Sequence, residues 1–382
     1  MVRFSIRQPL VHQLSMQYLL VVPVLLSVAA VFLLAWHGDV NTPLLYSQCH
    51  SRSRLPEISR IPFLGAPACF LVSLFMFASA SIRGITQLCV IVSFTSALLT
   101  VCRVEAARAC NQRSWNIRFP TLSWLLFNLV GGTIVWDLWI LPLFLRRAKD
   151  VRIERIKADA LGGSGGGGGD DSMEALEGEE RIMLERSLVT SAEVWAIPLA
   201  IAIGFVFPSA MMLALTNVKS VTVWLFFPVW VAVIHLAIKF VVVRISRDNG
   251  PIYLESHIAS LMLVYALPFL ASLFTHALFI WDLFWKDNSR ELTRMALKII
   301  GTDFIFIAAT VLYWVLAESG ITPAILLVVF TVFLGPGAAL CLTWLIRERA
   351  ICAFAVWDEQ DVSDEDSDGD GSTVHEYTPL VN

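Results

Sequence analysis

Charged residues are scarce in this chain: Asp, Glu, Lys and Arg make up only 16% of its 382 residues. Soluble domains are about 25% charged, so this chain, which is also 57% hydrophobic, is predicted to lie largely within a membrane. The net charge of −4 comes with no basic stripe along the sequence. This excludes a nucleic-acid-binding protein, and we expect no nucleic acid as a partner.

The chain also lacks the short motifs of several kinds of site. Its seven Cys residues show neither a CxxC pair nor the spacing of metal ligands, so neither a metal site nor a disulfide framework is expected. The glycine-rich stretch 162–169 does not end in Gly-Lys-Ser/Thr, which excludes a phosphate-binding loop. No apolar run offers two Asp residues four apart, as a magnesium-dependent membrane prenyltransferase would need. We therefore expect no metal and no cofactor.

Long apolar runs are what the chain has in abundance. A helix needs about 20 mainly apolar residues to cross a bilayer. The runs are continuous rather than alternating, which favours helices over a β-barrel. The predicted fold class is all-α: a polytopic transmembrane helical bundle of about nine spans, or eight if one run does not cross. The nine runs are 18–36, 61–81, 84–103, 121–145, 194–215, 221–243, 257–281, 299–317 and 323–346.

The glycine-rich stretch divides these runs into two groups. We expect an N-terminal four-helix membrane half at 1–145 and a C-terminal five-helix membrane half at 194–350, joined by a flexible linker at 146–193. The segment 351–382 is rich in carboxylates and is predicted to be a disordered acidic tail.

Targeting and orientation follow from the flanking residues. The first run comes after Arg3 and Arg7 and is not followed by a small-x-small cleavage site, so it is predicted to be a transmembrane helix that directs a multi-pass protein to the endoplasmic reticulum. With nine spans, Lys and Arg divide 13 to 14 between the two sides, which does not decide the orientation. The basic cluster at 146–157 places the linker in the cytosol. This puts the N-terminus in the cytosol and the acidic tail on the opposite side.

A few ionisable residues interrupt the apolar runs, where a charge costs about 2.5–3.5 kcal/mol. The candidates are Glu105, Arg108, Asp137, His235, His276 with Tyr265 eleven residues before it, and Asp303. Several of them also have a structural interpretation. Glu105 and Arg108 could form an ion pair at the interface that caps a helix. Asp137 could lie near the membrane edge, and His276 could bond a carbonyl group on a neighbouring helix.

Asp303 is the most informative of these candidates because no basic residue lies within one helical turn of it. An unpaired carboxyl group that faces an apolar cavity keeps its proton, since burial disfavours its charged form. Such a group can act as a Brønsted acid on a water-insoluble substrate. The chain also has 13 Trp and 24 Phe residues. Their rings stabilise a desolvated cation by about 0.5–2 kcal/mol each, although membrane helices also use aromatic residues for packing.

The sequence resembles a known family over about residues 40–350, through the order and spacing of several stretches. It is similar to the larger fungal integral-membrane terpene cyclases of meroterpenoid and indole-diterpene biosynthesis. The stretches that carry the resemblance are Pro62-Phe63-Leu64-Gly65 to Phe75, Val104-Glu105-Ala106-Ala107-Arg108, Gly204-Phe205-Val206-Phe207-Pro208, Phe227 to Ala232, Tyr265 to His276, Asp303, and Leu334-Gly335-Pro336-Gly337 to Arg349.

This resemblance implies an isomerase- or lyase-type enzyme without redox chemistry. Its reaction would be protonation of an alkene or epoxide on a prenylated precursor, followed by ring closure through a carbocation. By the same resemblance, Asp303 would donate or orient the proton. His276 and Tyr265 would bond the acid or take up the final proton, and Glu105 and Arg108 would anchor a polar headgroup or lock two helices together.

The implied partners are a lipophilic prenylated small molecule, membrane lipid and other enzymes of the same pathway. Asp137 and His235 are expected to be polar substrate-binding or structural residues. Three other functional classes stay open at this point. They are a proton-coupled small-molecule transporter, a membrane acyltransferase with His276 as base, and a structural or receptor-like membrane protein.

Overall fold

The computed structural model describes residues 10–36, 65–162, 187–246, 250–254, 257–286 and 289–348. Within these ranges the chain forms helices, together with two isolated β-bridges that join residues 108, 188 and 252. Half of the predicted linker, residues 163–186, and the whole acidic tail lie outside the described residues, so the expected flexibility of these segments stays a prediction. Residues 146–162 of the predicted linker are helical.

Six helical segments of the described chain are long and apolar enough to cross a membrane. This agrees with an all-helical membrane protein, whereas the expected count of about nine spans is not confirmed. One of the six is a composite of α11 (Glu193–Ile201), the π-helical turn η4 (Ala202–Val206) and α12 (Phe207–Leu215). The other five are α2 (Met16–Trp36), α5 (Ile82–Ala107), α14 (Phe227–Ile245), α15 (Ile258–Leu283) and α16 (Glu291–Ser319).

The other three predicted spans correspond to shorter helices. These are α4 (Gly65–Ala78), α7 (Thr121–Val130) and α17 (Ile321–Leu334), with 14, 10 and 14 residues. At 1.5 Å per residue they measure about 15–21 Å, which is less than the roughly 30 Å of a hydrocarbon core. None of the three is long enough to cross as a single straight helix.

The run 121–145 folds back on itself instead of crossing. After α7 the chain turns at Gly131, whose φ of +143° is available to glycine. It then returns through α8 (Gly132–Val135), the π-helical turn η3 (Trp136–Ile140) and α9 (Leu141–Gly162). The Trp139 indole N–H donates to Ser123 Oγ at 3.2 Å across 16 residues, a separation of about 24 Å in a straight helix. The predicted span is therefore wrong, and we call residues 121–145 the first hairpin.

The run 323–346 makes the same kind of turn. The helix α17 ends at Gly335, whose φ is +90°, and a second helix follows over residues 336–348. Arg347 Nη2 lies 2.6 Å from Glu318 Oε2, although 29 residues separate them. A continuous helix would hold these residues more than about 40 Å apart. This span is also corrected to a hairpin, and we call residues 321–348 the second hairpin.

Both hairpins open at the same end of the bundle. Arg147 Nε donates to the Cys110 carbonyl at 3.0 Å, and Lys149 Nζ donates to the Leu14 carbonyl at 2.8 Å. Arg108 and Glu348 pair at 2.6 Å at this same end. The chain at residue 348 is thus on the side where α2 begins, which corrects the expectation that the tail emerges on the opposite side. The reason is that each hairpin enters and leaves the membrane on one side.

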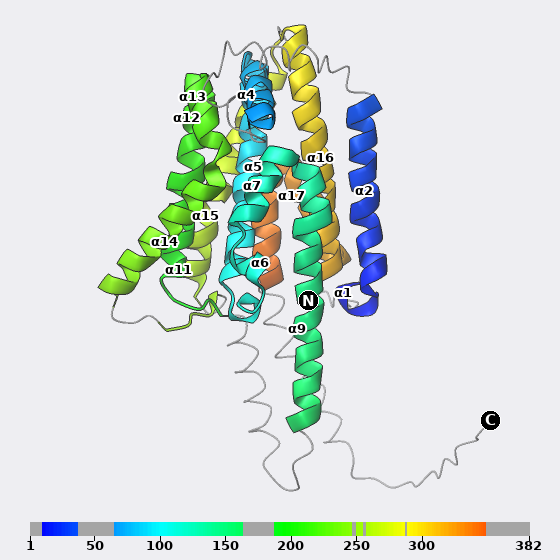
Figure 1. Cartoon of the computed structure of the whole chain (residues 1–382), viewed down its shortest axis with the longest axis vertical. Helices are drawn as coiled ribbons and strands as arrows, with labels where there is room; N and C mark the ends of the chain where they lie inside the picture. The colour runs from blue at the N-terminus through cyan, green and yellow to red at the C-terminus, as the bar shows by residue number, and fades with distance from the viewer. Residues whose placement is uncertain are drawn as a thin grey trace, which may run out of the picture.

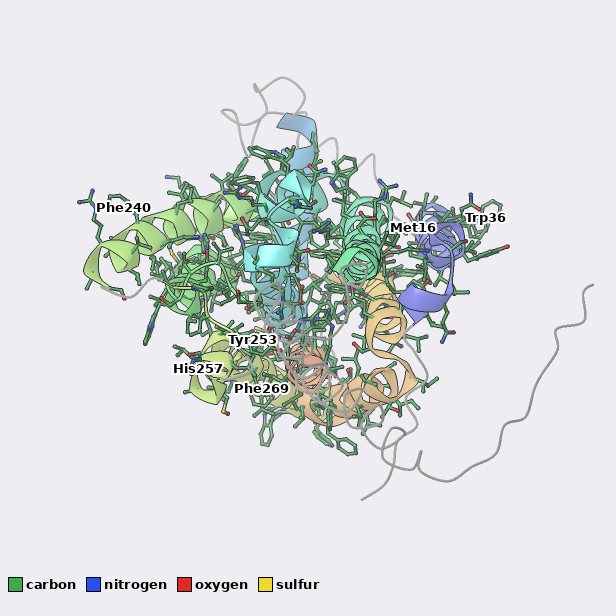
Figure 2. The ribbon with its side chains drawn as sticks, turned by 90° about the horizontal axis from the view of Figure 1, so that it is seen from below. Met16, Trp36, Phe240, Tyr253, His257 and Phe269 are labelled. Carbon is green, nitrogen blue, oxygen red and sulfur yellow. The ribbon has the colours of Figure 1, made fainter. Side chains whose placement is uncertain are left out.

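The helices form an elongated bundle in which α9 extends beyond the lower end (Figure 1). Seen from below, α2 with Met16 and Trp36 lies at one edge, and α14 with Phe240 lies at the opposite edge (Figure 2). The core is tied together by four fully buried indole rings. Trp314 of α16 lies 5.8 Å from Trp136 of the first hairpin and 4.5 Å from Trp344 of the second, and Trp136 lies 6.3 Å from Trp124.

The described cysteines differ in their bonding. Cys69 on α4 is disulfide-bonded, which the sequence did not indicate. The described free cysteines are Cys89, Cys102, Cys110 and Cys341.

The described basic residues are more numerous at the end where the hairpins open. By the positive-inside rule, this end is expected to face the cytosol. The described residues at this end include Arg108, Arg113, Arg118, Arg146, Arg147, Lys149, Arg244 and Arg347. Those at the other end are Arg83, Lys219, Lys286, Arg290, Arg294 and Lys298.

This arrangement predicts the side on which the C-terminus lies. A glycosylation tag fused after Asn382 should stay unglycosylated in microsomes, whereas the same tag inserted between Lys286 and Ser289 should be glycosylated. The measurement is a mobility shift that an endoglycosidase reverses. Glycosylation of both tags would show that one of the two hairpins crosses the bilayer, and glycosylation of the C-terminal tag alone would show the reverse orientation.

Candidate functional site

A cavity of about 500 Å³ lies between α4, α5, α16 and the tip of the first hairpin. Seven aromatic side chains line it, together with aliphatic residues, and no basic side chain does so among the described residues. The polar side chains in its wall are those of Thr95, Asn128 and Asp303. The aromatic residues are Phe70, Phe75, Phe94, Phe127, Trp224, Phe227 and Phe304.

Two of the three polar side chains donate hydrogen bonds to main-chain carbonyl groups. Thr95 Oγ1 donates to the Ile91 carbonyl at 2.9 Å, and Asn128 Nδ2 donates to the Leu225 carbonyl at 2.6 Å. Asp303 is the one ionisable side chain among the described residues that line the cavity.

Asp303 bonds the tip of the first hairpin. Its Oδ1 accepts from the backbone N–H of Thr133 at 3.0 Å, and the N–H of Gly132 also bonds it. Thr133 Oγ1 donates to the main-chain carbonyl of Asp303 at 2.9 Å. A Cβ on Gly132 would lie 2.6 Å from Asp303 Oδ2, so this close approach requires glycine.

This geometry corrects the expectation that Asp303 is unpaired. The first N–H groups of a helix have no partner within that helix, and the first hairpin presents those of α8 inside the bundle. Asp303 caps them. No sequence signal indicates this pairing, because the partners lie 170 residues apart.

Asp137 lies on the return arm of the first hairpin, in η3, and is fully buried. It is electrostatically coupled to Asp303 and faces the Thr310 hydroxyl on α16. The structure thus brings together two of the predicted residues. One interpretation of the sequence had Asp137 near the membrane edge, whereas the structure encloses it in protein.

His276 caps the second hairpin. Its Nε2 lies 3.1 Å from the Val332 carbonyl, one of the last carbonyls of α17, which have no partner within their own helix. This contact corresponds to the structural interpretation of His276, a bond to a carbonyl on a neighbouring helix. His276 is absent from the described lining of the cavity, and the structure does not bring it to Asp303.

The turn beside His276 makes a specific stability prediction. A Cβ on Gly335 would lie 2.7 Å from His276 Cβ, whereas a Cβ on Gly320 would meet no atom within 4 Å. Both glycines have positive φ, +90° and +88°. Gly335→Ala should therefore be the more destabilising by about 1–3 kcal/mol, because it adds overpacking to the same backbone strain. Unfolding of the purified variants in denaturant measures the difference, and equal losses would show that His276 does not pack tightly against Gly335.

Glu105 and Arg108 belong to a buried ion cluster at the end of the bundle where the hairpins open. Arg108 pairs with Glu105 at 3.2 Å and with Glu348 at 2.6 Å. Arg347 pairs with Glu105 at 3.0 Å, with Glu318 at 2.6 Å and with Glu348 at 3.0 Å. These contacts join α5, α16 and the second hairpin, so the observed role of the predicted pair is to hold helices together.

Tyr265 lies next to this cluster rather than next to His276 or Asp303. Its hydroxyl group is buried, has no hydrogen-bond partner among the described residues, and interacts electrostatically with Glu348 and Arg108. The catalytic role expected for Tyr265 stays a prediction.

His235 forms a third polar group, on α14. Its Nε2 lies 2.7 Å from Glu193 Oε2, and Lys239 Nζ lies 2.5 Å from Glu193 Oε1. The contact joins α14 to the start of α11 and is separate from the cavity. His235 is thus placed as a structural residue.

Sequence reasoning missed Glu193, Glu318 and Arg347. Each lies at the end of an apolar run, where a charged residue is expected to face water or lipid headgroups. Glu318 and Arg347 are buried where α16 packs against the second hairpin, and Glu193 is buried where α11 packs against α14. The Gly335-Pro336-Gly337 turn is the one sequence signal that could have indicated the second hairpin.

No protein-family model, no curated protein and no solved structure matches this chain.

Proposed function

We propose that this protein is a membrane-bound terpene cyclase of the type found in fungal meroterpenoid and indole-diterpene pathways. The observation that supports this proposal best is the cavity, an apolar space lined by aromatic rings with a single carboxyl group in its wall. Ligand cavities measure about 300–1,000 Å³, and at about 500 Å³ this one suits a molecule with a long prenyl chain.

In the proposed reaction, Asp303 transfers a proton to a terminal alkene or epoxide of the bound substrate. The O–H bond of Asp303 breaks. With an alkene, a C–H bond forms and the second alkene carbon becomes a cation; with an epoxide, an O–H bond forms and a C–O bond breaks. An internal double bond attacks the cation and closes a ring. Loss of a proton to the Asp303 carboxylate then forms a new double bond.

The walls of the cavity support a carbocation mechanism. Phe94, Phe304 and Phe127 are among the aromatic residues that line the cavity, and Phe94 and Phe304 pack edge to face at 5.3 Å. Aromatic rings in such a wall stabilise a desolvated cation. The absence of a basic side chain from the described lining disfavours an anionic or phosphorylated substrate. The proposed substrate is neutral, lipophilic and prenylated.

We place the six crossing helices in the membrane of the endoplasmic reticulum, with both hairpins entering from the cytosolic side. The substrate reaches the cavity from the lipid phase, and the enzymes that prenylate and epoxidise it are the expected partners.

The proposal is tested with microsomes that contain the full chain. They are incubated with farnesylated phenols and with their terminal epoxides, and the extracts are searched for cyclic products of unchanged mass. Microsomes from cells with an empty vector give the background. If neither class of substrate is converted at normal protein levels, the proposed function is wrong.

A proton-coupled transporter is the second candidate, because transporters use discontinuous helices at the depth of the membrane. In such sites the N-terminus of a half-helix binds an anionic substrate. Here the corresponding N–H groups of α8 are occupied by Asp303. Uptake of a small molecule into vesicles, driven by a proton gradient, would support this second candidate.

A further inference from the structure

Asp137 is a buried carboxyl group that the proposed reaction does not yet use. Both of its oxygens are buried, no described group donates a hydrogen bond to them, and the residue is 0% exposed. Buried polar groups in native proteins nearly always have partners. Asp137 is therefore an exception among buried polar groups.

The surroundings of Asp137 lie along one interface between α16 and the return arm of the first hairpin. Asp303, Ile307 and Thr310 are spaced four and three residues apart, so they share one face of α16. This face packs against Gly132, Thr133 and Asp137, since Asp303 bonds Thr133 and a Cβ on Gly132 would lie 2.8 Å from Ile307 Cδ1. The π-helical turn η3 contains Asp137, and such turns are frequent at functional sites.

The hydrogen-bond donors available to Asp137 and to Asp303 indicate which of the two carboxyl groups holds a proton. Thr310 has a single hydroxyl hydrogen, which it donates to the Phe306 carbonyl at 2.8 Å. Toward Asp137 it can offer only lone pairs, so an ionised Asp137 would have no donor while a protonated Asp137 could donate to Thr310 Oγ1. Asp303 is in the opposite situation, because it accepts N–H groups from α8.

We propose that Asp137 holds the proton of this carboxyl pair in the resting protein and supplies it to Asp303. An isolated buried carboxylate costs far more than a neutral acid, which keeps the proton on Asp137. Asp303 is the ionised member, stabilised by the N-terminus of α8. This assignment of the proton stands by itself, while its use in catalysis rests on the proposed function.

The proton cycle balances without any co-reactant. The O–H bond of Asp137 breaks and an O–H bond forms on Asp303, so the negative charge moves from Asp303 to Asp137. Asp303 then protonates the substrate. When the final cation loses a proton to Asp303, that proton returns to Asp137, and the net reaction is an isomerisation. Asp137 is a positioning residue in this cycle because it does not line the cavity.

Infrared spectroscopy tests the assignment without a substrate. The full chain is purified in nanodiscs after labelling of its aspartate side chains with carbon-13, which separates them from glutamate. A protonated-carboxyl band that carries the label shift should be present at neutral pH. It should disappear in Asp137→Asn, move in Asp137→Glu and persist in Asp303→Asn. Tryptophan fluorescence monitors the fold of each variant.

Kinetics tests the use of this proton. Asp137→Asn should lower kcat by about 10²-fold and leave KM unchanged, with recovery of most activity in Asp137→Glu. A purely structural role would not produce this split between kcat and KM.

Each negative outcome overturns a separate statement. A labelled band that is missing, or that survives in Asp137→Asn, overturns the assignment of the proton, and the Asp137→Glu variant decides the matter if Asp137→Asn does not fold. Wild-type kcat in Asp137→Asn overturns the relay while leaving the cyclase proposal standing. A protein that converts no substrate contradicts the cyclase proposal, and the infrared result still reports on the proton.

Discussion

Asp303→Asn is expected to lower kcat for cyclisation by at least about 10²-fold, the usual contribution of a positioned general acid. The amide oxygen of Asn can still accept the N–H of Thr133, whose nitrogen lies 3.0 Å from Asp303 Oδ1. It cannot release a proton to the substrate. Product formation in microsomes, normalised to the amount of folded protein, measures the effect. An Asn variant that cyclises at the wild-type rate would remove Asp303 from the mechanism.

A second substitution at the same position separates chemistry from structure. Asp303→Ala removes both the group that carries the proton to the substrate and the hydrogen-bond acceptor, so the buried N–H groups of α8 lose their partner at a cost of about 1–3 kcal/mol. We expect Ala and Asn to be similarly inactive, with only Ala destabilised in thermal unfolding. Thr95→Val is the matched control in the same cavity, because Thr95 bonds its own helix and takes no part in the proposed reaction.

The largest loss of stability is expected from Arg347→Met, at about 3–5 kcal/mol, which is typical when one partner of a buried ion pair is removed. After the substitution, Arg108 is the one arginine left in the described cluster to balance the charges of Glu105, Glu318 and Glu348. Unfolding of the purified protein in denaturant measures the loss. The double variant Arg347→Met with Glu318→Gln should recover part of it, because one uncompensated charge is then removed.

Arg83→Met is the control for the ion cluster. Arg83 pairs with Asp282 at 3.2 Å, and its side chain is 21% exposed, against 12% for Arg347. A partly exposed pair contributes up to about 1 kcal/mol. If the two substitutions cost the same, the cluster does not hold the second hairpin in place.

The six long helices could be predicted from the sequence, since each contains an apolar stretch long enough to cross a bilayer. The hairpins could not be predicted from hydropathy, which averages over a run and does not register a turn inside it. The run 121–145 is apolar enough to cross, yet Gly131-Gly132 stands near its middle. The same holds for Gly335-Pro336-Gly337 in the run 323–346. Both are recognised turn signals, and length took precedence over them in our prediction.

The candidate site was accessible to sequence reasoning only in part. A charge inside an apolar run costs free energy wherever it lies, and this rule identifies Asp137, His276 and Asp303 as residues with a purpose. It does not identify the partners. Asp303 and His276 each cap a broken helix end from a segment far away in the sequence, and such a pairing depends on tertiary contacts. Asp137 was singled out, but its relation to Asp303 follows only from the packing of the first hairpin on α16.

The position of α16 between the two hairpins has a consequence for how the chain can vary. Asp303, Thr310, Trp314 and Glu318 lie on one side of this helix and contact both hairpins. Each residue advances a helix by about 100°. A one-residue insertion between Asp303 and Glu318 would turn the remainder of that side away, so the cap and the ion cluster could not form together. The rotation of the helix from one residue to the next fixes the spacing of these residues, whereas the residues of α16 that face lipid are free to change.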